Sequence, residues 1–218
     1  MSRRPRIVGP VAVLTVLVPL AFALAHFRQA AGEPINVDGD LWTDKVKKGA
    51  MEWDVRGVGT LVPAQDSSKL IARVTVPDDM AGELRPNQKA DLDTPNVKLK
   101  GCVIYITPWP SNGRRSIDIA VESRLLNGVG ARQEVDATIH LGTVENILYV
   151  VRPIHANQYS IIHVFKVVDD DQRAIRVNVK FGRASVNTIE VLGGLKEGDK
   201  IIPSDMSAWD NFDQIRLK

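Results

Sequence analysis

Cysteine is almost absent from this sequence, because Cys102 is the single one among 218 residues. One thiol cannot form a disulfide within the chain, so packing alone must hold the fold together. Cys102 lies in an alternating apolar run with Val103 and Tyr105, which is typical of a small buried side chain and not of a reactive thiol. We therefore expect a fold stabilised by hydrophobic cores, with a structural Cys102.

An excess of charge of one sign is also lacking. The chain has 28 Lys and Arg residues against 26 Asp and Glu residues, a formal net charge of +2. Nucleic-acid-binding proteins concentrate Lys and Arg on one face. The balance gives no electrostatic basis for binding nucleic acid.

Catalytic and metal-binding patterns are missing as well. There is no Gly-x-Ser-x-Gly elbow and no phosphate-binding loop with Gly-Lys-Ser/Thr. The histidines have no second ligand at the spacing of a metal site: His26, His140, His155 and His163. Asp205 and Asp210 flank Trp209, and such a pair could serve in hydrolysis, but acids in a polar turn are more often capping, solvated groups. We expect a protein that is not an enzyme and has no cofactor or metal.

One long stretch, Ile7–Phe27, contains no Asp, Glu, Lys or Arg. A helix of this length, at about 1.5 Å per residue, spans roughly 30 Å, the thickness of the hydrocarbon core of a bilayer. Arg3, Arg4 and Arg6 precede it, and flanking cations stay in the cytoplasm. We expect an uncleaved transmembrane anchor at 7–27 that leaves the N-terminus inside and exports the rest.

A cleaved signal peptide remains an alternative to the anchor. Ala21-Phe22-Ala23 and Ala23-Leu24-Ala25 both have the small-x-small form that signal peptidase needs. The apolar run is longer than the core of most signal peptides, roughly 7–15 residues, which favours the anchor. Both alternatives export the chain.

After a polar linker at 28–48, the pattern is one of short strands and turns. Val and Ile are plentiful and long amphipathic helical patterns are absent, which indicates a mainly β fold. Gly57 and Gly59 are expected to interrupt the first strand with a bulge or a close backbone approach. A closed or nearly closed barrel would hide the strand edges. The expected strands are 51–62, 70–76, 89–93, 97–107, 116–122, 135–141, 147–151, 160–168, 174–181 and 200–202.

Two turns stand out as candidate contact sites. Asn112-Gly113 is a strong signal for a tight hairpin turn. Asp169-Asp170-Asp171 is expected at a hairpin tip; an acidic triplet can bind calcium, but calcium loops alternate their ligands with other residues, so a solvated turn fits better.

Several segments resemble the periplasmic adaptor proteins, the membrane fusion proteins of the HlyD secretion type. Leu70–Asp79 and Leu84–Thr94 look like the β-barrel of that family, although Asn87 stands where the family usually has Gly. The membrane-proximal domain of a subgroup is similar to 149–153, 165–166, 179–202 and 204–210, and its incoming strand to 56–63. Such adaptors usually carry a lipoyl-like domain and a helical hairpin between the incoming strand and the barrel. Here Pro63 is followed within a few residues by Leu70, so both are missing.

The resemblance implies an organisation and a function. It divides the chain into the anchor at 7–27, the linker at 28–48, a membrane-proximal β domain (49–63 plus 144–218) and a small β-barrel domain (66–143). It implies a non-catalytic, shortened adaptor of an efflux or secretion system, on the periplasmic side of the bacterial inner membrane. Its partners would be an ABC or proton-driven transporter and further copies or a full-length adaptor; the alternative is a remnant or auxiliary adaptor without transport activity. The candidate contact residues are Asn112, Gly113, Arg114, Arg115, Asp169, Asp170 and Asp171.

Overall fold

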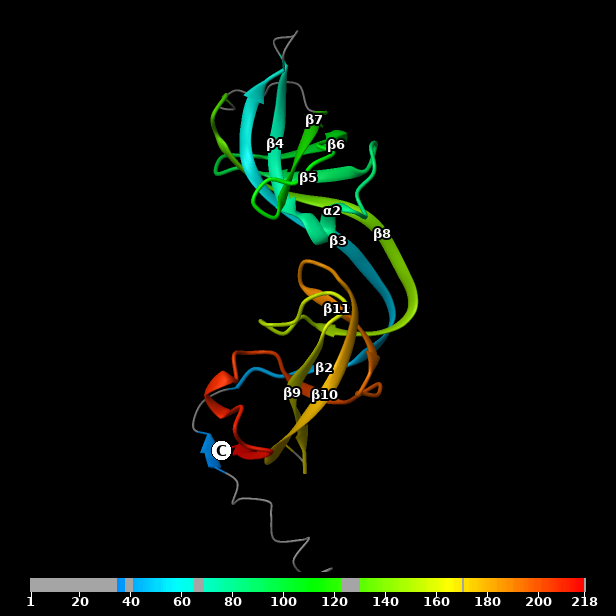
Figure 1. The fold of residues 1–218 in the computed structure, drawn as a ribbon, viewed down its shortest axis with the longest axis vertical. Coiled ribbons are helices and arrows are strands. Elements are labelled where there is room, and N and C mark those ends of the chain that lie inside the picture. The colour runs from blue at the N-terminus through cyan, green and yellow to red at the C-terminus, as the bar shows by residue number, and fades with distance from the viewer. Residues whose placement is uncertain (1–34, 38–40, 65–68, 123–129, 170, 218) are drawn as a thin grey trace, which may run out of the picture.

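The computed structural model describes residues 35–37, 41–64, 69–122, 130–169 and 171–217. Two β modules follow one another along the long axis, joined by a two-stranded ribbon (Figure 1). Within the described ranges the helices are the short α2 (Asp78–Ala81) and the 3-10 turn η1 (Ser207–Trp209). The strands are β1 (Ile35–Val37), β2 (Asp44–Lys45), β3 (Lys47–Pro63), β4 (Leu70–Pro77), β5 (Lys89–Asp93), β6 (Lys98–Ile106), β7 (Arg114–Val121), β8 (Glu134–Val151), β9 (Ile161–Val168), β10 (Arg173–Ala184), β11 (Thr188–Gly193), β12 (Lys200–Ile202) and β13 (Gln214–Leu217).

The mainly β expectation is confirmed, whereas the anchor at 7–27 lies outside the described residues. Among the residues that are described, no helix has both the length and the apolar character needed to cross a bilayer.

The first module is a closed six-stranded barrel. The strands follow the order β3-β4-β7-β6-β5-β8, and β8 pairs with β3 to complete the ring. Alternate side chains point inward, as the period of two requires, so Ala72, Val74 and Val76 of β4 are fully buried. Closure leaves no unpaired edge strand among the described strands of the barrel.

Gly59 lies where β3 comes close to the backbone of β4. A Cβ at this position would stand 1.9 Å from the Arg73 carbonyl oxygen and 2.6 Å from the Cα of Val74. The expected close approach is therefore present. The expected interruption is not, because β3 continues through Gly57 and Gly59 and keeps its register with β4.

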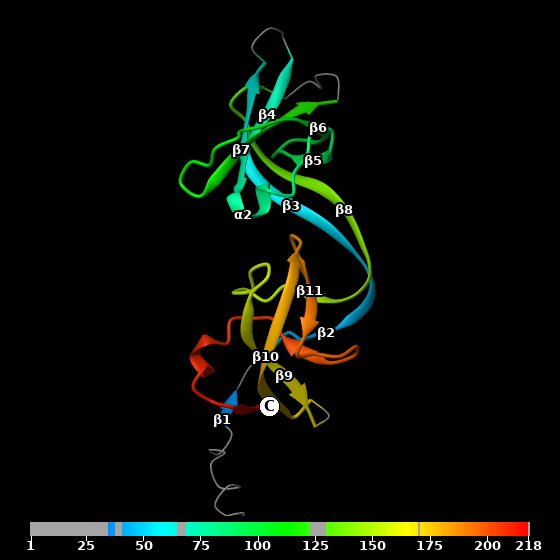
Figure 2. The ribbon, with the colours of Figure 1, turned by 45° about the vertical axis from the view of Figure 1, so that its right-hand side comes forward.

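β8 continues as one strand where the sequence indicated two, at 135–141 and 147–151. Its pairing with β3 shifts register between Gly49 and Met51 and again between Trp53 and Asp54. On β8 these shifts coincide with Asn146 (φ 54°) and Gly142 (φ 140°). Bulges of this kind bend a strand without ending it, and the β3/β8 ribbon curves between the modules (Figures 1 and 2).

Both long strands belong to both modules. The sequence interpretation assigned 49–63 to the second module, but Val55 and Leu61 of β3 are buried in the barrel core. The other end of β3 pairs with the end of β8 in the second module, at Lys47 and Tyr149. The barrel is thus inserted into the second module through one continuous ribbon.

The second module has two apolar cores on opposite sides of its sheet. Its strands follow the order β2-β12-β9-β10-β11-β8. One core contains Val164, Phe181 and Ile189. The other contains Phe165, Ile202 and Met206 and is covered by β1, β13 and η1.

The expectation of a linker at 28–48 is wrong for 35–37 and 41–48, the part of this range that the structure describes. β1 pairs in parallel with β13, and β2 pairs with β12. Val37 and Val46 are each only 2% exposed. These strands are too short to show a period, and their partners lie far away in sequence. β11 was not expected either.

Candidate functional site

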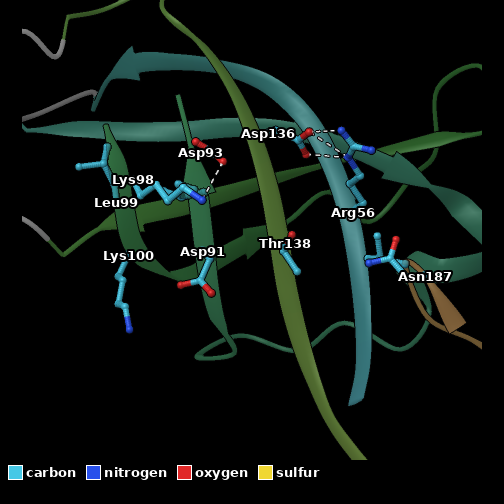
Figure 3. Close-up of a pocket in the computed structure, with 11 residues that line it drawn as sticks. Arg56, Asp91, Asp93, Lys98, Leu99, Lys100, Asp136, Thr138 and Asn187 are labelled. Carbon is cyan, nitrogen blue, oxygen red and sulfur yellow. Dashed lines mark hydrogen bonds and ion pairs between the residues drawn. The ribbon is translucent and has the colours of Figure 1, made fainter. Parts of the chain in front are cut away.

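A groove runs along the outside of the barrel toward the second module (Figure 3). Its volume is about 570 Å³, and its polar lining includes Arg56, Asp91, Asp136 and Asn187. Arg56 forms an ion pair with Asp136, and most of the charge here is neutralised locally. Lys98 lies 3.5 Å from Asp93 in a second, more exposed pair. Such paired charges suit contact with another polar surface.

His140 of β8 sits next to this groove and bridges two carboxylates from different strands. Its Nδ1 is 2.8 Å from Asp54 on β3, and its Nε2 is 3.1 Å from Asp91 on β5. Partial burial lowers the pKa of His140, but the hydrogen bonds to Asp54 and Asp91 outweigh that effect and leave it raised. The cluster ties three barrel strands together at the end that faces the ribbon.

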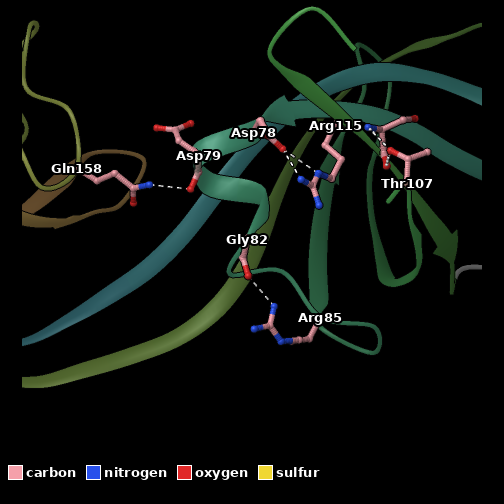
Figure 4. A network of polar contacts seen from close by, with 8 residues as sticks. Asp78, Asp79, Gly82, Arg85, Thr107, Arg115 and Gln158 are labelled. Carbon is pink, nitrogen blue, oxygen red and sulfur yellow. Dashed lines mark hydrogen bonds and ion pairs between the residues drawn. The ribbon is translucent and has the colours of Figure 1, made fainter. Parts of the chain in front are cut away.

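The two modules also touch directly. The Gln158 side chain donates to the Asp79 carbonyl of α2 at 2.8 Å (Figure 4), and the Asp54 N–H donates to Ser185 Oγ at 3.0 Å. The Arg183 guanidinium lies 5.4 Å from the centre of the Trp53 ring, at the bend of the ribbon. The Gln158 contact joins α2 to the loop between β8 and β9. The other two contacts join β3 to the end of β10 and to the turn that follows it.

The turn at Asn112–Arg115 forms as expected but presents only part of its charge. Asn112 (φ 51°) and Gly113 (φ 69°) adopt the left-handed conformation of a tight turn. Arg115 is engaged internally, 2.9 Å from Asp78 (Figure 4), so it is unavailable to a partner. Arg114 is exposed and donates to the Thr75 carbonyl at 2.9 Å.

The loop before this turn contains a residue that the sequence analysis did not single out. Trp109 is 82% exposed, more than any other large hydrophobic residue described. It stands between Pro108 and Pro110, in the part of the β6–β7 connection that precedes the Asn112-Gly113 turn. The signal was available, because Pro108 and Pro110 lack backbone N–H groups and so keep Trp109 out of a regular strand.

The acidic tip at Asp169–Asp171 connects β9 to β10 as expected. Asp169 pairs with Arg173, and Asp171 pairs with Lys200; Asp170 lies outside the described residues. The tip belongs to the second module and the Asn112–Arg115 turn to the first, so the structure does not bring the two candidate sites together (Figure 1).

An apolar pocket opens on the second module. It has a volume of about 320 Å³, and its apolar lining includes Ile154, Ile161, Phe165 and Met206. Phe165 and Met206 are buried, whereas Ile154 is 66% and Ile161 67% exposed.

Acidic groups stand beside this apolar pocket. Asp205 accepts a hydrogen bond from the Ser207 N–H at 3.0 Å and lies 3.3 Å from His155 Nε2. These contacts, with the Ser207 N–H as the largest cause, lower the pKa of Asp205 to about 2. Asp210 lines the pocket and contacts Arg176 through its backbone carbonyl.

Metal-binding geometry is not found in the part of the chain that the structure describes. No group of three or more His, Cys, Asp or Glu there could hold a metal ion. His155 is within hydrogen-bonding distance of Asp205, and His140 of Asp54 and Asp91.

Comparison with known proteins adds little to this geometry. No family model matches the sequence, and no curated protein matches it. Among solved structures, ZneB from Cupriavidus metallidurans is similar, with 17% identical residues and a TM-score of 0.37. The match covers 65% of this chain and 42% of the ZneB chain, so this chain spans less than half the length of that structure.

Proposed function

We propose that this chain is a shortened, non-catalytic periplasmic adaptor of the membrane fusion protein type. It is anchored in the bacterial inner membrane by residues 7–27, with the N-terminus in the cytoplasm and both β modules in the periplasm. It docks on an inner-membrane transporter of an efflux or secretion system.

The topology of the ribbon is the observation that supports this proposal most. β3 leaves the second module, enters the barrel and is followed by the remaining barrel strands, after which β8 returns to the second module. The sequence resemblance implies this order for an adaptor, with a membrane-proximal domain assembled from both sides of a barrel. The motifs that carry the resemblance lie on β4 and β5 of the barrel, on β3 and β8 of the ribbon, and on β9–β12 and η1 of the second module.

The connection between β3 and β4 supports the shortened form. The Ala64 N–H donates to the Lys69 carbonyl at 2.9 Å, and Pro63 pairs with Leu70. This hairpin closes at the place where the family carries its lipoyl-like domain and helical hairpin. The second candidate function is a remnant or auxiliary adaptor without transport activity. The same short connection supports it, because in the family the helical hairpin reaches toward an outer-membrane duct and the lipoyl-like domain helps line the channel.

Co-purification from membranes tests the proposal. The tagged full chain, extracted in mild detergent, should retain an ABC or proton-driven transporter identifiable by mass spectrometry. A chain with the same tag and residues 1–34 followed by an unrelated periplasmic domain controls for the anchor. Recovery of no transporter, or of equal amounts with the control, would contradict docking.

Complementation separates the two candidate functions. Expression in a strain that lacks a full-length adaptor should restore export if this chain acts alone. If export requires a full-length adaptor in addition to this chain, the chain has the auxiliary role.

A further inference from the structure

The tip, which is the 108–110 segment of the β6–β7 loop, presents an exposed tryptophan, and the second module has an apolar pocket with acidic residues beside it. We propose that Trp109 of one copy of this chain docks in the pocket lined by Ile154, Ile161 and Met206 of a second copy. This contact needs no transporter and so stands independently of the proposed function.

Trp109 has the properties of an interface anchor. It is 82% exposed, and tryptophan is enriched among the residues that dominate binding energy at protein interfaces. Pro108 and Pro110 fix their own φ angles, so the loop loses little conformational freedom when it binds. The tip thus presents an aromatic ring in a stiffened segment.

The pocket suits one bulky side chain. Its volume of about 320 Å³ falls at the small end of the range for ligand pockets, roughly 300–1,000 Å³. Phe165 and Met206 form a buried apolar floor, and the largely exposed Ile154 and Ile161 form walls that an indole ring would cover.

The charges beside the two surfaces are opposite. Arg114 is exposed next to the tip, and its hydrogen bonds go to the hydroxyl and carbonyl of Thr75, not to a carboxylate of the described residues. Asp210 lines the pocket, and Asp205 lies beside it. Opposite charges at the rim of an apolar contact steer the partners and fix their orientation.

The tryptophan that fills the pocket comes from a second copy, because within one chain Trp109 lies outside the pocket and is exposed to solvent. Trp109 belongs to the barrel and the pocket to the second module. The hydrogen bonds from Gln158 to Asp79 and from Asp54 to Ser185 fix the modules in an arrangement in which Trp109 stays solvent-exposed. A contact between two different surfaces is heterologous and propagates to a ring or a filament.

Self-association of the full chain in mild detergent tests this contact by sedimentation over a range of concentrations. Trp109→Ala and Ile161→Asp should each weaken association about tenfold or more. Leu192→Ala, at a 50% exposed position outside the tip and the pocket lining, should not change it. Arg114→Asp should weaken association, and Asp210→Arg in the same chain should restore it. A monomeric parent chain, or association that Trp109→Ala leaves unchanged, would overturn the proposal.

Cross-linking distinguishes a second copy from closure of one chain on itself. In a Cys102→Ser background, one variant carries Ser111→Cys beside the tip and another carries His155→Cys at the pocket. Their mixture should form a disulfide-linked dimer that neither variant forms alone. A chain that carries both cysteines and cross-links only within itself would show that the tip fills its own pocket, which overturns the proposal.

Discussion

His140 Nδ1 lies 2.8 Å from Asp54 Oδ1, and this contact joins β8 to β3 at the point where the ribbon enters the barrel. Asp91 of β5 lies on the other side of the same ring, at 3.1 Å. The backbone N–H of Asp54 reaches the second module through Ser185. The titratable side chain of His140 therefore lies where the ribbon enters the barrel and connects their strands.

This cluster predicts a pH dependence of stability. The pKa of His140 is raised in the folded chain, so its contribution is fully present below the unfolded pKa, about 6.5, and is lost as the pH rises through the folded value. Its side chain is 40% exposed, so the effect should be small, about 1 kcal/mol or less. Urea unfolding from pH 6 upward should show decreasing stability, and His140→Gln should flatten this part of the profile. An unchanged slope in His140→Gln would contradict the role of the cluster.

The ion pair of Arg115 with Asp78 should stabilise the barrel. Both side chains are partly buried, at 22% and 37% exposure, and hydrogen bonds to charged groups contribute about 1.5–3 kcal/mol. Arg115→Met should lower the free energy of unfolding by about 1–2 kcal/mol. Lys100→Met, at a groove position with no ion pair to any described residue, should change it by less than about 0.5 kcal/mol. Equal effects of the two substitutions would be inconsistent with a structural Arg115.

Gly59 should tolerate no side chain. A Cβ there meets the backbone of Arg73 and Val74, so Gly59→Ala forces β3 and β4 apart and should cost about 3 kcal/mol or more. Gly82 is the matched control, since it has helical dihedrals and no described atom lies within 4 Å of the place that a Cβ would take. Gly82→Ala should be neutral or stabilise by about 0.4–1 kcal/mol. Denaturant unfolding measures the stability of both variants. A small loss of stability in Gly59→Ala would mean that β3 and β4 are not in close contact at this position.

The contact between Asp54 and Ser185 should protect one amide from exchange. Ser185 is only 4% exposed, and its hydroxyl accepts from the Asp54 N–H. Ser185→Ala removes the acceptor, and exchange of the Asp54 amide should accelerate about tenfold through local opening. Asn187→Ala, in the same turn, should leave that amide unchanged. Hydrogen exchange measured by NMR tests this prediction. Fast exchange of the Asp54 amide in the parent chain would mean that the two modules are not held together at this contact.

Most strands were predictable because their burial alternates. Ile117 and Ile119 on β7, and the turn at Asn112-Gly113, follow directly from local pattern and local conformation. β1 and β2 were not predictable in this way, since strands this short depend on β13 and β12, which lie at the other end of the chain. The continuity of β8 was hidden because Gly142 and Asn146 look like strand ends and act as bulges.

The candidate contacts were only partly accessible from sequence. The turn at Asn112–Arg115 could be located, but tertiary structure decides that Arg115 pairs with Asp78 while Arg114 stays exposed. The His140 cluster draws its members from three strands far apart in sequence, and no spacing rule brings them together. The pocket around Ile161 likewise depends on the packing of β9 against the segment before η1.

The compartment of the two β modules is the most direct test of the account, because a periplasmic adaptor must work outside the cytosol. Protease added to intact spheroplasts should degrade the barrel and the second module, while a cytosolic marker survives. The fragment that remains should be short, membrane-bound and N-terminal. Full protection of both modules until the inner membrane is lysed would contradict the account.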